Sequence, residues 1–121
     1  MPVVADITKI DAPSSAPVGG QVIVDVSVKN ISGVDRYIAV TGVFDSTNLS
    51  WQFDYLLVSP GQTVIMRGWF TMPSKNVEVT AWSWYWDGSK WVLDETQTVN
   101  ISLTTLVPTI SEFSIADYIK A

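Results

Sequence analysis

Apolar and polar side chains alternate along most of this sequence with a period of two, and this period constrains the fold more than any other feature. Such alternation is typical of β-strands that bury one face, because successive side chains of a strand point to opposite sides. The clearest run has four valines on one face: Val22, Val24, Val26 and Val28. Its other face carries polar side chains and one exception, Ile23. The run predicts a strand with one buried side.

The same alternation predicts further strands that are separated by turn residues. They cover residues 6–11, 37–44, 63–72, 77–86 and 90–103, with a short strand of mixed facing over 51–58. Pro60-Gly61 predicts a tight turn, and Asp87-Gly88 predicts a hairpin between the last two strands. About seven strands at this spacing favour an all-β fold of two packed antiparallel sheets, since one sheet would leave its own apolar face uncovered. A closed barrel is the alternative.

The length of 121 residues is that of one domain. We expect a β-sandwich domain over residues 1–108 and a C-terminal extension over residues 109–121. In the extension Ser111 could cap a helix, whereas Phe113 and Ile115 alternate as in a strand, which we favour. The extension loosely resembles residues 7–11, so it is either a chance match, which we favour, or the start of a further repeat.

Residues that the sequence lacks exclude several classes of function. It has no cysteine and no histidine, which removes disulfides, thiolate nucleophiles, imidazole bases and the usual zinc ligands. Asp94 and Glu95 are adjacent, so in a regular strand they would point to opposite faces and could not form a hydrolase pair. Asp45 could meet Asp54, and Asp87 could meet Asp94, but we expect solvated surface charges. We therefore predict no catalytic residue, no metal site and no cofactor.

The charge and the distribution of apolar residues bear on partners and location. A net charge of -5 repels a phosphate backbone, so nucleic acid is not an expected partner. No stretch approaches the ~18 apolar residues of a membrane helix, so membrane insertion is not expected either. The start of the sequence, from Met1 to Asp6, has no basic segment and no long apolar core, so no secretory signal is expected in this chain. This favours a virion component over a cell-surface protein.

Several short motifs follow one another in an order that resembles the immunoglobulin-like or fibronectin-III-like modules of bacteria and archaea, and the CARDB type in particular. They are residues 18–21, 28–33, 59–63 and 70–73, followed by the aromatic hairpin around Asp87-Gly88. The resemblance covers roughly residues 18–103 and depends on the spacing of turns and strands rather than on a chemical motif. It implies an immunoglobulin-like β-sandwich with a binding or spacing role. Such modules occur in cell-surface repeats and in structural proteins of phages and archaeal viruses.

Six tryptophans in one short domain require an explanation. If the apolar residues at positions 77, 79 and 81 face the core, alternation places three tryptophans on the opposite face: Trp82, Trp84 and Trp86. In an immunoglobulin-like sandwich the third strand and the last two strands share one sheet. The resemblance therefore implies that Tyr37 and Trp91 lie beside this row and that the face is rich in aromatic rings.

Three interpretations of this row are open. The rings could cover one another within the fold, which we favour, or they could form a surface for a protein partner or for self-association, or they could stack on a glycan. A bulge near Ser83 would turn one or two of the tryptophans into the core. Trp69 beside Arg67 could form a cation–π pair or simply pack, and Trp51 supports no assignment.

The sequence as a whole predicts a non-enzymatic structural or interaction module of a larger assembly, either a virion component or a cell-surface repeat. The predicted binding residues are Trp82, Trp84, Trp86, Trp91 and Tyr37. A carbohydrate-binding module that uses the tryptophan row is the alternative.

Overall fold

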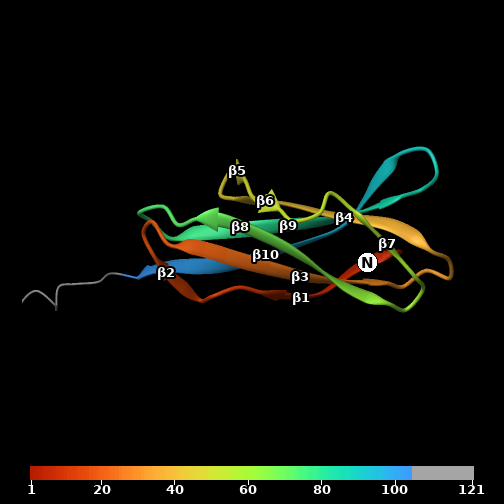
Figure 1. Cartoon of the computed structure of the whole chain (residues 1–121), viewed down its shortest axis with the longest axis horizontal. Coiled ribbons are helices and arrows are strands. Elements are labelled where there is room, and N and C mark those ends of the chain that lie inside the picture. Colours follow the sequence, from red (N-terminus) through yellow and green to blue (C-terminus); the bar gives the residue numbers. More distant parts are fainter. Residues whose placement is uncertain (105–121) are drawn as a thin grey trace, which may run out of the picture.

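Two β-sheets face each other in the computed structural model, which describes residues 1–104 (Figure 1). Within this range six strands are long: β1 (Ala5–Asp11), β3 (Gln21–Asn30), β4 (Arg36–Phe44), β8 (Thr63–Thr71), β9 (Val77–Trp86) and β10 (Trp91–Thr104). Four have only two or three residues: β2 (Ser15–Pro17), β5 (Thr47–Asn48), β6 (Ser50–Trp51) and β7 (Leu56–Val58). The all-β prediction is confirmed. The predicted boundary at residue 108 and the extension 109–121 lie outside the described residues.

The strands divide into a four-stranded sheet, in the order β1-β3-β8-β6, and a six-stranded sheet, in the order β2-β10-β9-β4-β5 with β7 also paired to β4. Strands β4, β9 and β10 share the second sheet, as the immunoglobulin-like arrangement implies. The pairs are antiparallel except for β2 with β10, which is parallel. The sequence predicted only a turn where β2 lies. In residues 1–104 no helix has the length and apolar character needed to cross a membrane.

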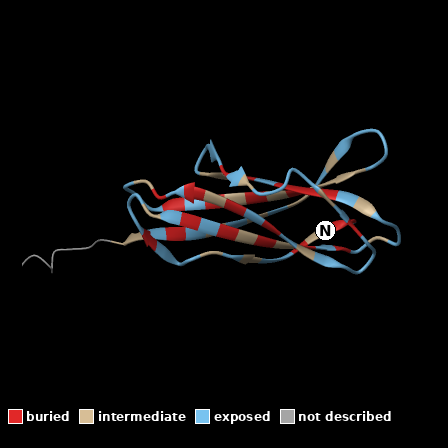
Figure 2. Ribbon diagram, viewed as in Figure 1, coloured by how far each residue is buried: buried red, intermediate tan, exposed pale blue. Residues whose placement is uncertain are grey.

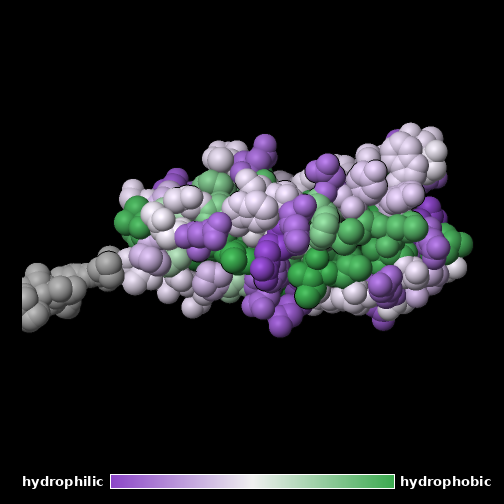
Figure 3. Space-filling view, viewed as in Figure 1, coloured by the Kyte–Doolittle hydropathy of each residue, from purple (hydrophilic) through white to green (hydrophobic). Residues whose placement is uncertain are grey.

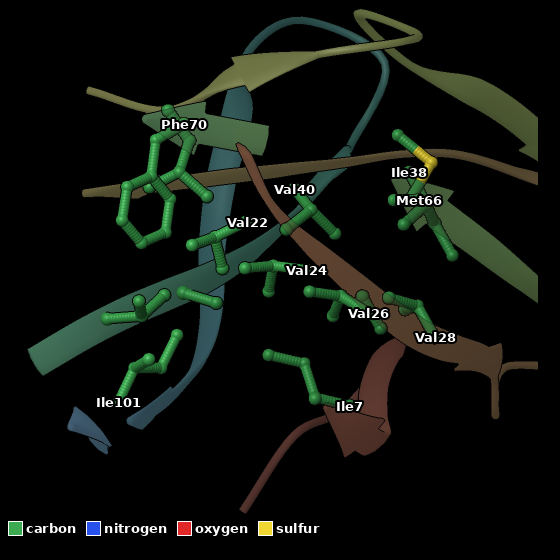
Figure 4. Close-up of a cluster of buried hydrophobic side chains, with 14 of the residues drawn as sticks. Ile7, Val22, Val24, Val26, Val28, Ile38, Val40, Met66, Phe70 and Ile101 are labelled. Carbon is green, nitrogen blue, oxygen red and sulfur yellow. The ribbon is translucent and has the colours of Figure 1, made fainter. Parts of the chain in front are cut away.

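The core lies between the sheets and follows the predicted alternation. Figure 2 shows buried and exposed residues taking turns along the long strands. The four valines of β3 at positions 22, 24, 26 and 28 are fully buried. They face apolar side chains of the second sheet, among them Ile38 and Val40 of β4 (Figure 4). Burial on this scale, at about 25 cal/mol per Å² of apolar surface, is the main force that holds the two sheets together.

Inward-facing and outward-facing side chains alternate without a break along strand β9. Val77, Val79, Ala81 and Ser83 are buried, and the three tryptophans alternate with them on the opposite face. The register between β4 and β9 runs without a break from Ile38 opposite Tyr85 to Phe44 opposite Val79. The bulge considered near Ser83 therefore does not occur in β9. The irregularity of this hairpin lies in β10, between Leu93 and Glu95.

Side chains of the six-stranded sheet, rather than a backbone ladder, hold the free edge of β1. The carboxylate of Asp94 accepts hydrogen bonds from the N–H groups of Val3, Val4 and Ala5 at 2.9, 2.8 and 2.6 Å. Glu95 accepts the N–H of Ile7 at 2.7 Å. The hydroxyl of Ser83 donates to the carbonyl of Ala5, and the amide of Gln97 donates to the carbonyl of Ile7. These four side chains satisfy an edge that would otherwise be unpaired.

This arrangement corrects the prediction that Asp94 and Glu95 point to opposite faces. The bulge in β10 inserts Asp94 between two paired positions, so strict alternation fails at this point. Both carboxylates then reach the backbone of β1. They serve the fold, because each accepts N–H groups that no strand pairs with.

The short strand predicted over 51–58 is also corrected. Ser50–Trp51 forms β6 at the edge of the four-stranded sheet, whereas Leu56–Val58 forms β7 beside β4 in the other sheet. The chain crosses from one sheet to the other within residues 52–55. The mixed facing of this segment thus reflects two strands in two layers rather than one irregular strand.

Candidate functional site

The outer face of the six-stranded sheet gathers aromatic side chains at one end. Trp91 of β10 lies opposite Trp86 of β9, with ring centroids 5.6 Å apart. Trp84 lies opposite Leu93 on one side and Ala39 on the other. We call the surface formed by the rings of Tyr37, Tyr55, Trp84, Trp86 and Trp91 the aromatic face.

The five residues predicted as a binding site differ in exposure. Trp91 and Tyr37 keep 37% and 44% of their surface exposed. Trp82, Trp84 and Trp86 are only partly buried, so the row is neither fully covered nor fully open. Trp82 lies further along β9, between Thr41 and Thr96, away from the end where the other rings meet. The structure therefore brings four of the five predicted residues together.

Tyr55, which the sequence did not single out, completes the group. It precedes β7, is 52% exposed, and contacts Tyr37 edge to face with centroids 5.5 Å apart and planes at 90°. Its ring also lies 5.9 Å from that of Trp91 at 49°. No periodic pattern marks Tyr55, because it lies in the loop that crosses between the sheets.

Two adjoining hollows open between these rings. Tyr37, Tyr55, Trp86 and Trp91 line the first, which has a volume of about 320 Å³. The second, of about 360 Å³, is lined by Ala39, Thr41, Asp54, Tyr55, Trp84 and Trp91. Tyr55 and Trp91 line both hollows, so the two adjoin at these rings, and most of the lining side chains are aromatic. Volumes of this order are those of small-molecule or side-chain pockets.

Few polar groups border the hollows. The indole N–H of Trp84 is already bound, since it donates to the hydroxyl of Thr41 at 2.9 Å. In the described part of the chain, Asp54 is the one charged residue that lines a hollow, and it is exposed. Among residues 1–104 no lysine or arginine lies within ion-pair distance of its carboxylate.

The arginines of the described chain make other contacts. Arg67 binds Asp25 through two hydrogen bonds of 2.9 Å, from Nε and from Nη2, on the outer face of the four-stranded sheet. These bonds lower the pKa of Asp25 below its ordinary value. A cation–π contact joins Arg36 and Tyr85, with the guanidinium carbon 5.6 Å from the ring centroid. The pair of Arg67 with Trp69 that the sequence allowed is thus replaced by an ion pair with Asp25.

The other carboxylates that were considered as pairs have separate roles. Asp45 accepts the N–H of Glu78 at 3.2 Å and lies 3.2 Å from the ammonium of Lys75, and these contacts lower its pKa. Asp87 accepts the N–H groups of Ser89 and Lys90 in the β9–β10 turn, which lowers its pKa. Both therefore stabilise turns or strand ends.

A second exposed apolar area lies on the opposite side of the molecule. In Figure 3 a continuous hydrophobic area covers the half of the face near β7 and the first part of β8. Exposed apolar side chains of β8 and of the loop after β3 include Ile31, Val34 and Ile65. They are aliphatic and line neither hollow, so the aromatic face is the better-formed candidate site.

The sequence matches no family model, and no curated protein is similar to it. Its structure is similar to that of the CARDB domain of the PF1109 protein from Pyrococcus furiosus, solved in complex with di-metal ions. The TM-score is 0.62 at 16% sequence identity, over 84% of this chain and 94% of that one.

The residues described here do not fit a pair of metal ions. Across residues 1–104 no three aspartates or glutamates gather to form a set of metal ligands. The adjacent pair Asp94 and Glu95 is already bound to the backbone of β1. What the comparison shows is the architecture: the chain folds as an immunoglobulin-like β-sandwich similar to a CARDB domain.

Proposed function

We propose that this chain is a non-enzymatic interaction module of a larger assembly, a virion component or a cell-surface repeat, and that a protein partner docks on the aromatic face. The observation that carries the proposal is the pair of hollows on the outside of a sheet whose inner face already completes the core. Tryptophan and tyrosine supply large, rigid contact surfaces at low conformational cost, and they dominate the energetics of protein interfaces.

Site-specific photo-crosslinking in the native assembly tests this proposal. A photoreactive amino acid at position 57, at the margin of the aromatic face, is compared with one at position 27 on the outer face of the four-stranded sheet. Leu57 pairs with Tyr37, whereas Ser27 pairs with Ile65. We expect a defined protein adduct from position 57 and none from position 27. Adducts from position 27 alone would contradict the proposal.

Light scattering of the purified chain asks whether the partner is a second copy. Concentration-dependent association that is lost in Trp91→Ala would identify self-association as the form of the interaction. The matched control is Trp69→Ala, which removes an indole from the other sheet. A strict monomer, together with no crosslink from position 57 in the assembly, would refute an assembly role for this face.

A carbohydrate ligand is the second candidate, and the exposed ring of Trp91 beside both hollows favours it. Pyranose rings stack on such indoles. Binding on a glycan array that is lost in Trp84→Ala with unchanged folding would support this function. Absence of binding to every glycan would exclude it.

A further inference from the structure

The charge of the aromatic face indicates what kind of group it receives. Within residues 1–104, Asp54 is the only charged residue that lines either hollow, and no cation pairs with it. The chain as a whole carries a net charge of -5. A cationic partner is therefore attracted to this face, and an anionic one is repelled from it.

The orientation of the rings also favours a cationic group. Neighbouring rings meet at 90°, 49° and 66°, so they do not form one flat platform. A flat apolar group can therefore stack fully on only one of them. The face of each ring carries a partial negative charge, so a cation that lies between the rings is attracted by more than one of them.

We propose that the two hollows receive an arginine side chain of the protein partner, whose guanidinium stacks on Tyr55 and Trp91 and pairs with Asp54. This inference rests on the proposed function, because it assigns the group by which the partner binds. Arginine fits better than lysine, since its planar guanidinium is weakly hydrated and stacks on aromatic faces. Its edge donors find an acceptor in the Asp54 carboxylate.

Both contacts proposed for the partner's arginine, with an aromatic ring and with a carboxylate, also occur within this chain. Arg36 lies over the ring of Tyr85 at 5.6 Å, on the inner side of the same strand pair. Arg67 binds the Asp25 carboxylate with two hydrogen bonds of 2.9 Å. At the aromatic face the rings and the carboxylate are present together, and the partner supplies the missing guanidinium.

A titration with matched peptides tests the inference. Acetyl-Gly-Arg-Gly-amide is compared with the same peptide in which citrulline replaces arginine, so that the planar shape is kept, while the charge is removed and a carbonyl oxygen replaces one terminal amino group. The readout is the indole N–H signals of the six tryptophans in a proton–nitrogen NMR spectrum. We expect the arginine peptide to shift the Trp86 and Trp91 signals, and to bind about fivefold more tightly than the citrulline peptide.

Two variants with the same change of net charge separate a specific contact from general attraction. Asp54→Asn is expected to weaken binding of the arginine peptide about threefold to tenfold and to leave the citrulline peptide unaffected. Asp11→Asn, in β1 of the other sheet, is expected to change neither. Trp91→Ala is expected to abolish the shift of the Trp86 signal.

Equal binding of the two peptides, or absence of any shift with either, would overturn the inference. Equal loss of arginine binding in Asp54→Asn and Asp11→Asn would do the same, because it would reduce the effect to long-range attraction. The proposed function is judged separately: an adduct from position 57 in the native assembly would maintain it even if arginine were not the recognised group.

Discussion

The indole of Trp51 lies against the Cα atom of Gly68, so closely that a Cβ at that glycine would be 2.9 Å from Cζ3 of the ring. Gly42, in the opposite sheet, faces the same indole, and its Cβ would be 3.2 Å from Cζ2. Trp51 belongs to β6 of one sheet and Gly42 to β4 of the other. One tryptophan thus fills the space between the sheets at the point where β4 and β8 each carry a glycine. A glycine within a strand allows such a close approach, because it has no side chain.

We expect Gly68→Ala to lower the free energy of unfolding by about 1–3 kcal/mol, because the added methyl group overpacks the contact with Trp51. Urea unfolding at 25 °C measures the change. Gly33→Ala is the control, since a Cβ there meets no atom within 4 Å. Its unfolding free energy should change by less than about 1 kcal/mol.

A double-mutant cycle identifies the cause of this loss. In a Trp51→Ala background, Gly68→Ala should cost much less, because the ring that the methyl group would strike is gone. The same cost in both backgrounds would show that backbone entropy or another neighbour, rather than the indole, makes glycine necessary.

The attachment of β1 leads to a second prediction. Asp94→Ala removes the acceptor of three backbone N–H groups and leaves them unpaired beside the six-stranded sheet. We expect a loss of about 2–3 kcal/mol in the free energy of unfolding. Hydrogen exchange of the Val4 and Ala5 amides should become faster, while the amide of Val24 in β3 should keep its protection relative to global unfolding.

The control for Asp94 is another acidic residue that lacks such contacts. Asp35→Ala removes an exposed carboxylate in the loop before β4 and should change stability by less than about 0.5 kcal/mol. If Asp94→Ala unfolded at the same urea concentration as the parent protein, the side chains of β10 would not be what holds β1.

The pattern of β3 and β9 predicted the fold because each of these strands obeys a local rule. Every second residue of β3 is fully buried, and β9 keeps its parity through Ser83, so alternation alone places the tryptophans outside. The turn at Pro60-Gly61 could also be predicted from neighbouring residues alone. Gly61 has a φ of 79°, as a turn with proline before glycine requires.

The features that the sequence did not reveal depend on contacts between distant segments. Asp94 is about ninety positions from the N–H groups that it binds, and only the bulge in β10 aims it at them. Tyr55 joins the aromatic face because residues 52–55 cross between sheets, and no period marks that crossing. For Trp51 a signal was present, since Gly42 and Gly68 interrupt otherwise regular strands, but pairing them with one ring requires the topology.

Stability should depend on pH through Asp6. Burial, followed by the neighbouring carboxylate of Glu95, raises the pKa of Asp6 above its ordinary value of 3.8. A carboxyl group whose pKa is higher in the folded protein contributes stability below its unfolded pKa, and this contribution is lost as the pH rises through the folded pKa. We therefore expect Asp6→Asn to raise the urea midpoint at about pH 7 and to lose that advantage at about pH 3.

A carboxylate with the opposite shift provides the control for this pH dependence. Hydrogen bonding to Arg67 lowers the pKa of Asp25, so its contribution is present above 3.8 and is lost as the pH falls through the folded pKa. Asp25→Asn should accordingly lower the urea midpoint at neutral pH and converge with the parent protein in acid. A difference between Asp6→Asn and the parent protein that stayed constant from neutral to acidic pH would contradict the role given to Asp6.

Asn30 is the buried polar side chain whose replacement should cost most. Its Nδ2 donates to the carbonyls of Val34 and Val58 at 2.9 and 2.8 Å, and its Oδ1 accepts the N–H and the hydroxyl of Ser32. In Asn30→Asp an oxygen would face both carbonyls, so we expect a loss of about 3 kcal/mol or more in the free energy of unfolding. Asn48→Asp, at an exposed position, should change stability by less than about 0.5 kcal/mol. Equal urea midpoints for the two variants would show that the amide of Asn30 does not join the β3–β4 loop to β7.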